Sequence, residues 1–448
     1  MANSAYYYVT GAAGNQKTLT LSGWFKVASF TDATFFSYHD QVSGSSARSE
    51  IYLNASSKLV VGINPSGSSW KELTFNNLLR DPSAWYHIVV AYDTTQATEA
   101  DRVKVYINGN QYTAASGTYP SLNEDTGWNA NGYQHTIGRY EVSDNMYLNG
   151  CVSHTHFIDG TAYAPTAFGE FDSTSGIWIA KSSPSVTFGD EGAFFKFASG
   201  ALTTDSSGNS NTLTAVGTPT DTKDTPDNNF ATWNPLIYGA SSLTIANGNN
   251  AVTDVATTSY HSIYGTIPVS TGKWYWEIKN VNEDGTNGRM SWGIGDVENL
   301  QNANPGEVGD KSNGWTWDSA GGYKVNGSGG QESGDYLSYA TGDIIAFALD
   351  CDNAKLYLAK NNTWQKSGDP TSGATGTGAI SITADVTYAP GGNMRYSGTE
   401  AAINFGNGYF GTTAVTSAEA DGNGEGQFEY APPTGYFALC TNNLGSES

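Results

Sequence analysis

The sequence has few cysteines and no long apolar run. Its 448 residues include only 3 cysteines, and no two of them form a Cys-x-x-Cys pair, so the sequence indicates neither a disulfide framework nor a zinc site. No run approaches the roughly 18 apolar residues of a membrane-spanning helix. Residues 1–10 have neither the basic segment nor the apolar segment of a signal peptide. We therefore expect a soluble protein that is made in the cytoplasm and reaches any other site by assembly or cell lysis.

Basic residues are also scarce. There are 21 lysines and arginines against 43 acidic residues, which gives a formal net charge of −22. Binding to nucleic-acid phosphates needs lysine and arginine, and docking on an anionic membrane needs them too. The sequence therefore predicts no nucleic-acid partner and no membrane insertion. Its large net charge favours solubility and limits non-specific contacts.

Glycine and aromatic residues are abundant. The chain contains 53 glycines, 12 tryptophans, 27 tyrosines and 18 phenylalanines. The aromatic side chains provide enough apolar area for sizeable cores, although the hydrophobic fraction is only 38%. Aromatic residues and threonine favour strands, glycine and asparagine favour turns, and no segment shows a convincing 3.6-residue periodicity. The composition therefore predicts an all-β protein.

Short alternating patterns bounded by turn residues support this prediction. In residues 102–113, apolar residues alternate with polar ones, and Asn108-Gly109 supplies the positive φ angles of a type I′ turn. Residues 49–63 have the same alternation and predict a hairpin that turns at residues 54–57. Both segments are typical of antiparallel strands.

The stretch of residues 217–235 divides the chain. It carries three prolines, and its first half contains no large apolar residue. Proline fixes φ and lacks an N–H donor, so this stretch fits neither a helix nor a central strand. We therefore predict a β domain at residues 1–216, a linker at residues 217–242 and a second β domain at residues 243–448.

The first domain resembles a known family. The segments WYHIVVAYD, VKVYINGNQYT and TIGRY follow one another in the order seen in laminin-G-like, concanavalin A-like jelly rolls. Residues 156–181, 205–213 and 224–236 resemble a module of bacteriophage tail and capsid appendage proteins. The resemblance covers residues 5–236. It implies a virion protein with a β sandwich, and this fold hosts both lectins and glycoside hydrolases.

The second domain resembles a SPRY domain over residues 243–444. The motifs that carry the resemblance are WYWE, GIG, GDIIAFALD, KLYLAKNN, INFG and PPTGYFALCTNNL, in this order. They imply a bent antiparallel β sandwich that usually serves as a binding module without catalysis. Partner recognition is implied for loops, here residues 318–335 and 367–379. The latter has almost no large side chain, so we expect it to be mobile or packed on a neighbouring subunit.

Catalytic acids are the first functional residues to consider, because the resemblance includes hydrolases. Concanavalin A-like hydrolases place their acids on one strand in an E-x-D-x-(x)-E pattern, and a retaining glycosidase needs two carboxyl groups about 5–5.5 Å apart. Glu170-Phe171-Asp172 is the nearest match, but it lacks the third acid and lies in a Gly- and Ser-rich stretch. We therefore expect a solvated turn there and no enzymatic activity.

Metal-binding candidates lie at two places. His154 and His156 are two residues apart and share one face of an expected strand, but no third ligand is evident, and stacking is the favoured interpretation. Asp205, Asn209 and Asn211 alternate as in calcium loops with oxygen ligands, although a structural Asx-turn is the default interpretation. We predict no cofactor. A structural Ca²⁺ at the last three residues stays open, because laminin-G-like domains often hold this ion.

Aromatic loop residues are the candidates for ligand binding. Trp128 and Tyr133 lie among Asn, Gly and Asp residues, and flat rings beside amide groups suit the faces and hydroxyls of sugars. The favoured alternative is a tryptophan buried under its own loop. Trp315 and Trp317 precede the glycine-rich stretch 318–335 and are the candidates in the second domain.

Together these observations predict a non-enzymatic virion structural protein of a bacteriophage. It is a capsid decoration, head-fibre or tail-fibre component at the virion surface. The expected partners are other virion proteins, further copies of the chain in a homo-oligomer, and a host-surface glycan if the protein takes part in host adsorption. A free carbohydrate-binding lectin, a glycan hydrolase and a cellular SPRY adaptor are the alternatives. The missing acid pattern argues against the hydrolase, and three scattered cysteines cannot build the zinc module that usually accompanies the adaptor.

Overall fold

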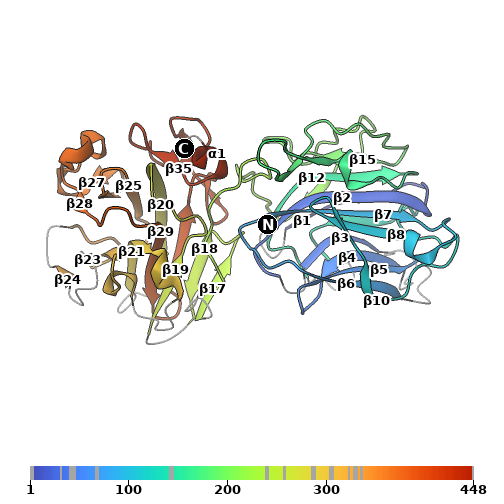
Figure 1. Ribbon diagram of the computed structural model, residues 1–448, viewed down its shortest axis with the longest axis horizontal. Helices are drawn as coiled ribbons and strands as arrows, with labels where there is room; N and C mark the ends of the chain where they lie inside the picture. Colours follow the sequence, from blue (N-terminus) through green and yellow to red (C-terminus); the bar gives the residue numbers. More distant parts are fainter. Residues whose placement is uncertain are drawn as a thin grey trace. The chain divides into compact units, whose positions relative to one another are not determined.

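The chain is almost entirely β (Figure 1). The computed structural model describes residues 5–30, 33–39, 47–65, 70–140, 146–237, 242–255, 259–283, 289–301, 307–320, 323–325, 331–332 and 336–445. Within these residues the one α-helix is α1 (Thr441–Leu444), and no helix is long and apolar enough to cross a membrane. The chain divides into two compact units, Met1–Asp221 and Thr222–Ser448. The prediction of an all-β chain is confirmed.

The first unit consists of two large antiparallel sheets. The eight-stranded sheet has the order β10 (Ala114–Gly117), β6 (Lys71–Leu78), β5 (Lys58–Asn64), β4 (Arg48–Leu53), β3 (Ala33–His39), β11 (Gln134–Ile137), β1 (Tyr6–Thr10) and β16 (Thr214–Val216). The six-stranded sheet has the order β15 (Ala193–Phe195), β12 (Gly150–Asp159), β2 (Thr18–Val27), β7 (Trp85–Asp93), β8 (Val103–Ile107) and β9 (Asn110–Tyr112). A separate hairpin pairs β13 (Gly169–Phe171) with β14 (Trp178–Ala180).

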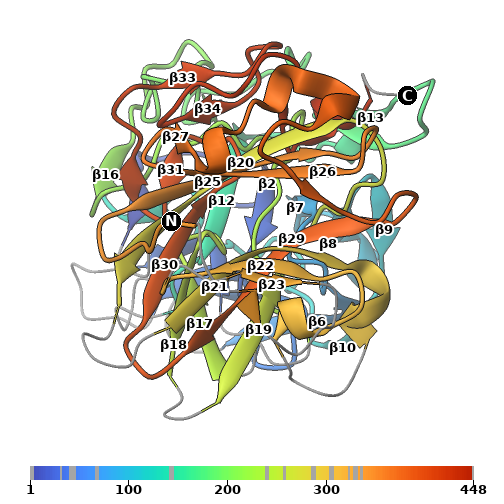
Figure 2. The ribbon, with the colours of Figure 1, turned by 90° about the vertical axis from the view of Figure 1, so that its left-hand side faces the viewer.

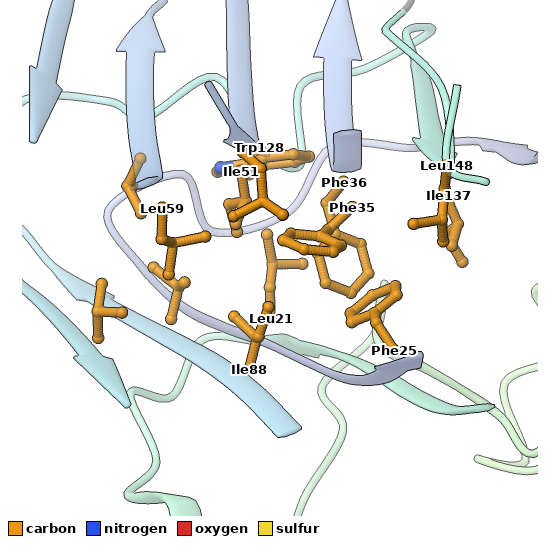
Figure 3. Close-up of a cluster of buried hydrophobic side chains, with 14 of the residues drawn as sticks. Leu21, Phe25, Phe35, Phe36, Ile51, Leu59, Ile88, Trp128, Ile137 and Leu148 are labelled. Carbon is orange, nitrogen blue, oxygen red and sulfur yellow. The ribbon is translucent and has the colours of Figure 1, made fainter. Parts of the chain in front are cut away.

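The core of the first unit lies between these two sheets. Side chains alternate between the faces of a strand, so every second residue points to the same side. Phe25 of β2 and Phe36 of β3 come from opposite sheets, and their ring centres are 5.4 Å apart in an edge-to-face arrangement. Figure 3 shows these rings packed with Leu21, Ile51 and other buried aliphatic side chains. The predicted β sandwich is thereby confirmed for the first unit.

Two hairpins of the first unit form where the sequence predicts them. Strands β4 and β5 are joined through residues 54–57, in register from Leu53 with Leu59 to Arg48 with Asn64. Strands β8 and β9 are joined through Asn108 and Gly109, whose φ angles are +47° and +78°. Both values lie in the left-handed region that the two residue types tolerate best.

The second unit is built in the same way. Its nine-stranded sheet follows the path β17 (Leu243–Ala246), β18 (Ala251–Asp254), β30 (Glu400–Asn404), β20 (Lys273–Asn282), β25 (Ile344–Asp350), β26 (Lys355–Lys360) and β27 (Thr363–Trp364), with β28 (Ile380–Ser381) beside β26 and β35 (Phe437–Ala438) beside β20. The six-stranded sheet has the order β19 (Tyr260–Tyr264), β29 (Tyr388–Arg395), β21 (Arg289–Asp296), β22 (Trp315–Asp318), β23 (Tyr323–Val325) and β24 (Gln331–Glu332). Two short hairpins pair β31 (Tyr409–Phe410) with β32 (Thr413–Ala414) and β33 (Glu419–Ala420) with β34 (Gln427–Phe428).

Tryptophans dominate the core of the second unit. In Figure 2 the long strands β20, β25 and β26 run side by side in the nine-stranded sheet. Trp276 of β20 stacks on Phe347 of β25 with ring centres 5.3 Å apart, and both side chains are fully buried. Large aromatic rings bury much apolar area per residue, so this core forms despite the low hydrophobic fraction.

The boundary between the units falls inside the predicted linker of residues 217–242. Residues from Thr222 onward belong to the second unit. Phe230 forms an isolated antiparallel β-bridge with Cys440. Trp233 is fully buried, and the centre of its ring lies 5.4 Å from that of Trp292. The later part of the predicted linker is therefore a structural part of the second unit.

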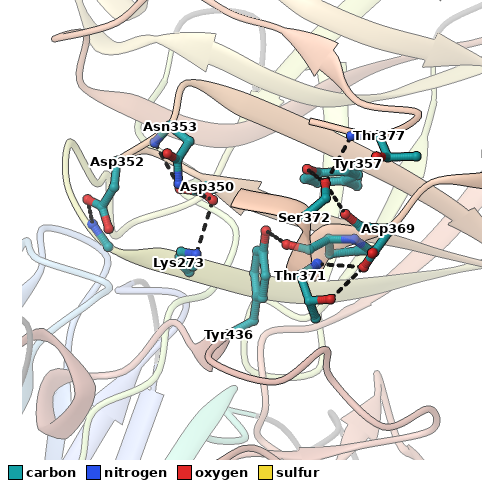
Figure 4. A network of polar contacts seen from close by, with 12 residues as sticks. Lys273, Asp350, Asp352, Asn353, Tyr357, Asp369, Thr371, Ser372, Thr377 and Tyr436 are labelled. Atoms are coloured by element: carbon teal, nitrogen blue, oxygen red, sulfur yellow. Dashed lines mark hydrogen bonds and ion pairs between the residues drawn. The ribbon is translucent and has the colours of Figure 1, made fainter. Parts of the chain in front are cut away.

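The loop of residues 367–379 packs on its own unit. The Tyr436 hydroxyl donates to the Pro370 carbonyl at 3.0 Å, and the hydroxyls of Tyr357 and Ser372 are 3.2 Å apart. The Asp369 carboxylate caps the turn by accepting from the Thr371 backbone at 2.9 Å (Figure 4). Polar contacts within the loop and to neighbouring strands take the place of the missing large side chains. These contacts hold the loop against its own unit.

Candidate functional site

Trp315 and Trp317 are core residues. They lie on β22, point to the inner face of the sheet, and are 1% and 0% exposed. The Trp315 ring packs edge-on against Tyr388 at 5.6 Å, and the Trp317 Nε1 donates to the Leu337 carbonyl at 3.1 Å. Their prediction as exposed contact residues is wrong, because these two positions belong to a buried strand rather than to the loop that follows it.

Trp128 is also buried. Its side chain is 1% exposed and lies in the core of the first unit beside Ile51 (Figure 3). Its role as an exposed stacking ring is therefore corrected in favour of the alternative, a tryptophan beneath its own loop. Tyr133 is half-buried against the same core, and its carbonyl accepts from the Gly11 backbone at 2.9 Å.

The candidate calcium residues, Asp205, Asn209 and Asn211, stabilise a loop by hydrogen bonds. The Asp205 carboxylate accepts from the backbone of Phe194 at 2.9 Å and of Asn211 at 2.9 Å. The amide groups of Asn209 and Asn211 both donate to the Gly192 carbonyl, at 2.8 and 3.0 Å. These contacts support the Asx-turn interpretation. In the described part of the chain no group of three acidic, His or Cys side chains could hold a metal ion.

Glu170 and Asp172 lie in the short hairpin of β13 and β14. The Asp172 carboxylate accepts from the backbone of Ser175 at 2.7 Å, and this hydrogen bond lowers its pKa. Glu170 faces solvent, with its carboxylate 3.7 Å from the Lys181 ammonium. An exposed, ionised turn acid is a poor proton donor near neutral pH. The geometry therefore supports the solvated-turn interpretation of these two residues.

The His156 ring stacks on Phe194, and the His154 ring lies near the same phenylalanine in a tilted arrangement. The ring of His156 lies 4.1 Å from that of Phe194 at an angle of 14°, and the His154 ring lies 6.0 Å away. A bulge separates Ser153 from His156 in the pairing of β12 with β2. Burial lowers the pKa of His156 well below its ordinary value, so its ring is neutral. The contact of His156 with Phe194 agrees with the stacking interpretation.

A buried serine and histidine form a pair that the sequence does not reveal. Ser22 Oγ lies 2.8 Å from His87 Nε2, and Trp178 Nε1 donates to His87 Nδ1 at 3.0 Å. Since Nδ1 accepts, the proton of the neutral ring lies on Nε2, which donates to the serine oxygen. His87 is thus no base for Ser22, and burial lowers its pKa to about 3. The pair does not form an activated nucleophile.

A cluster of aromatic and charged side chains lies on the outer side of the eight-stranded sheet. Trp70 Nε1 donates to Glu72 at 2.8 Å, and Arg48 Cζ lies 4.5 Å from the centre of the Trp70 ring. Arg48 Nη1 donates to the Tyr140 hydroxyl at 2.8 Å, and Nε lies 3.1 Å from Glu50. We call these five residues, Arg48, Glu50, Trp70, Glu72 and Tyr140, the outer polar-aromatic face.

The alternation of side chains along the strands places the residues of the outer polar-aromatic face on one side of the sheet. In β4, Ile51 and Leu53 point into the core, so Arg48 and Glu50 point outward. Gly62 of β5 lies between Glu50 and Glu72 in the cross-strand register. The alternation in RSEIYL contains this signal, but the sequence alone does not bring Trp70 or Tyr140 to the same place.

Burial raises the pKa of Glu50, the acid at the centre of the face, to about 7. The neighbouring Glu72 adds to this rise, and Arg48 opposes it. The Glu50 side chain is only 5% exposed, whereas that of Arg48 is 31% exposed. The accessible part of the face is therefore the arginine with the half-buried Trp70, Tyr140 and Glu72 side chains.

A second aromatic stack continues the same side of the sheet. Arg139 Cζ lies 4.4 Å from the Tyr6 ring centre, and the Tyr6 ring is 6.3 Å from those of Tyr8 and Tyr147. Two arginines stacked on aromatic rings thus lie along this sheet in a chain with few basic residues. The arrangement presents planar apolar surface beside hydrogen-bond donors.

A small cavity lies where two of the predicted candidate loops meet. Trp128 and Asn211 both line it, with Ile137 and Phe157 among its apolar walls. Its volume is about 50 Å³, which is room for roughly four water molecules. It is too small for a sugar ring, so the outer polar-aromatic face is the better candidate site.

Comparisons with known proteins agree with the fold of the first unit. Residues 2–164 match the Laminin_G_3 family, described as the concanavalin A-like lectin/glucanases superfamily. No curated protein sequence matches the chain.

Similar solved structures include two SPRY domains and a pentraxin. The SPRY domain of human HERC1 is 18% identical with a TM-score of 0.28, covering 36% of this chain and 91% of that one. The heptameric SAP-like pentraxin of Limulus polyphemus is 16% identical with a TM-score of 0.27, covering 36% and 72%. The TRIM65 PSpry domain is 8% identical with a TM-score of 0.27, covering 39% and 91%. In sequence, residues 2–164 are similar to concanavalin A-like lectins and glucanases.

Proposed function

We propose that the protein is a non-enzymatic structural component of a bacteriophage virion that binds a carbohydrate through the outer polar-aromatic face of its first unit. The observation that carries the binding site is the stack of Arg48 on Trp70, joined to Tyr140 and Glu50 on an outward-facing sheet. The similarity of residues 2–164 to concanavalin A-like lectins supports a carbohydrate as the ligand.

The chemistry of the face suits a sugar. Sugar rings offer apolar C–H faces and many hydroxyl groups, and aromatic rings beside fixed polar groups complement both. The Trp70 and Tyr140 side chains are half-buried, so they are ordered and still reachable. Their hydrogen bonds to Glu72 and Arg48 fix them before a ligand arrives, which reduces the entropy lost on binding.

The virion setting rests on the sequence resemblance. Residues 156–181, 205–213 and 224–236 resemble a module of phage appendage proteins, in the same order. The partners of this proposal are other virion proteins and further copies of the chain, with the protein at the virion surface. A net charge of −22 keeps such a protein from associating non-specifically with nucleic acid.

Glycan arrays test the binding proposal. Purified full-length protein should bind a defined set of glycans, and Trp70→Ala should weaken this binding at least tenfold, because tryptophan contacts often contribute more than ~2 kcal/mol. Trp364→Ala is the matched control, since Trp364 is a half-buried tryptophan of the second unit. If both variants bind like the wild type, or if no glycan binds, the proposed site is wrong.

Mass spectrometry of purified particles tests the virion proposal. The protein should be found in particles of the phage that encodes it, in a copy number that matches a symmetric arrangement on the capsid or tail. Absence from particles, together with glycan binding by the free protein, would favour a stand-alone lectin instead.

One observation favours a glycan hydrolase as the second candidate. Glu50 and Glu72 lie on either side of Gly62 in the cross-strand register, so two acids share the outer face of the sheet, and a glycosidase needs a pair of acids. The pKa of Glu50, raised to about 7, suits a general acid. Its 5% exposure and its ion pair with Arg48 argue against contact with a substrate.

Reducing-sugar release distinguishes this candidate. We expect no hydrolysis by the wild type on any glycan that the protein binds. Hydrolysis that disappears in both Glu50→Gln and Glu72→Gln would replace the non-enzymatic proposal with an enzymatic one.

A further inference from the structure

The guanidinium of Arg48 is held on several sides, and part of it is left for a ligand. Its Nε faces Glu50, its Nη1 bonds to Tyr140, and its plane packs on Trp70. Its Nη2 makes no hydrogen bond to any residue that the structure describes. Because the side chain is 31% exposed, a ligand group can reach this guanidinium.

A carboxylate is the ligand group that fits best. Arginine presents its N–H donors in a rigid plane that matches the geometry of an oxyanion, and charge-assisted hydrogen bonds are roughly twice as strong as neutral ones. The contacts with Trp70 and Tyr140 fix this plane, so little side-chain entropy is lost when an anion binds. A neutral hydroxyl uses only one donor and gains no charge assistance.

The acid beneath Arg48 decides how much positive charge the face presents. The described titratable groups that act on Glu50 are Arg48 and Glu72, and Glu50 in turn acts on the neighbouring phenols of Tyr52 and Tyr140. Both phenols have a raised pKa and stay neutral between pH 6 and 8. The pKa of Glu50 lies at about 7. Below it Glu50 is uncharged, and the charge of Arg48 is available to a ligand.

We propose that the outer polar-aromatic face selects sugars that carry a carboxylate, that this carboxylate binds the guanidinium of Arg48, and that protonation of Glu50 strengthens the binding. The inference rests on the proposed glycan binding and names its ligand class as acidic sugars. The sugar ring packs beside Trp70 and Tyr140 while its carboxylate takes the free donor of Arg48. Above neutral pH the Glu50 carboxylate competes with that of the ligand for the same cation.

Acidic glycans printed beside their methyl esters test the ligand class. The probes are oligosaccharides of galacturonate, glucuronate and sialic acid, each with its carboxyl-methylated counterpart, and the full-length protein is applied at pH 6 and pH 8 at one ionic strength. We expect at least one acid to bind at least tenfold tighter than its ester at pH 6. Its affinity should fall several-fold at pH 8, while binding of the ester stays constant, because Glu50, beside Arg48 in the face, changes its charge in this range.

Three variants assign the effect to residues. Glu50→Gln keeps the shape of the side chain and removes its titration, so the acid should bind tightly at both pH values. Arg48→Met keeps the aliphatic stem and should abolish the difference between acid and ester. Arg80→Met removes the same charge from an exposed position elsewhere in the first unit and should behave like the wild type. Circular dichroism confirms that each variant is folded.

The outcomes separate this inference from the proposed function. If acids and esters bind equally well and Trp70→Ala abolishes both, the ligand class is wrong and glycan binding stands. If Glu50→Gln keeps the wild-type pH dependence, the role of Glu50 is wrong. If no glycan binds in either form, the proposed function fails and this inference fails with it.

Discussion

The indole of Trp70 lies directly on Gly62, so that a Cβ at position 62 would come within 2.2 Å of two ring carbons. Glycine inside a strand usually weakens the strand, and a close approach by another group is a common reason for its presence. Here the missing side chain makes room for the ring on which Arg48 packs. The geometry of the outer polar-aromatic face therefore depends on a residue that cannot itself touch a ligand by a side chain.

Gly62→Ala should weaken glycan binding without unfolding the protein. The added methyl group displaces the Trp70 ring and, with it, the Arg48 side chain that packs on the ring. Replacing a glycine inside a strand also lowers the entropy cost of folding, which stabilises the strand by roughly 0.5–1 kcal/mol. Binding should fall at least tenfold on a glycan array, with an unchanged circular dichroism spectrum. Gly422→Ala, where the nearest side-chain atom lies 3.3 Å away, is the control. Unchanged binding of Gly62→Ala would show that the ring position does not matter.

Trp317→Ala should destabilise the second unit strongly. The side chain is fully buried in the core, and large-to-small changes of buried aromatic residues cost about 3–5 kcal/mol. Urea unfolding of the fragment 222–448 measures the loss. Trp364→Ala, at a half-buried position, should cost clearly less. An equal or smaller loss for Trp317→Ala would contradict its place in the core and reopen its role as a contact residue.

The stability of the second unit should fall as the pH rises through neutrality. Burial raises the pKa of Glu277 to about 7, although its carboxylate accepts from the backbone of Glu429 and Tyr430 at 2.9 and 2.8 Å. Because this folded pKa is above the unfolded value, the contribution of the group is complete below about pH 4.5 and is lost as the pH rises through about 7. The loss amounts to roughly 3 kcal/mol.

Glu277→Gln provides the check on this pH dependence. Chemical unfolding of the fragment 222–448 between pH 5 and 8.5 should show a falling stability for the wild type and a flatter profile for the variant. The fragment is used because the pKa of Glu50 in the first unit is also raised, and its titration would add to the loss of stability. Stability that rises with pH in this range is incompatible with a raised Glu277 pKa.

A cut after Asp221 should leave two folded units, whereas a later start should not. The fragment 222–448 keeps Phe230 and Trp233, which are fully buried in the second unit. The fragment 236–448 lacks both and should lose several kcal/mol or fail to fold, because each missing ring leaves a cavity. Calorimetry of the two fragments compares them. Equal melting temperatures would mean that the stretch before residue 236 is a linker in the structural sense as well.

Much of the architecture follows from the sequence by itself. The alternation in residues 49–63 and 102–113 determines strands, and Asn108-Gly109 determines the turn between β8 and β9, because only a few residue types tolerate two positive φ angles. The abundance of aromatic residues determines how the cores are filled, and the prolines of residues 217–235 locate the division of the chain. These are local properties, so the local sequence contains them.

The location of the candidate site was decided by the tertiary structure. Whether a tryptophan is a core residue or a contact residue depends on what covers it, and alternation alone does not tell the inner face of Trp315 and Trp317 from an outer one. Arg48, Trp70 and Tyr140 are far apart in the sequence and meet only because β3, β4, β5, β6 and β11 lie in one sheet. The raised pKa of Glu50 likewise depends on burial by groups from other strands. Contacts between distant segments create both properties, and the local sequence does not contain them.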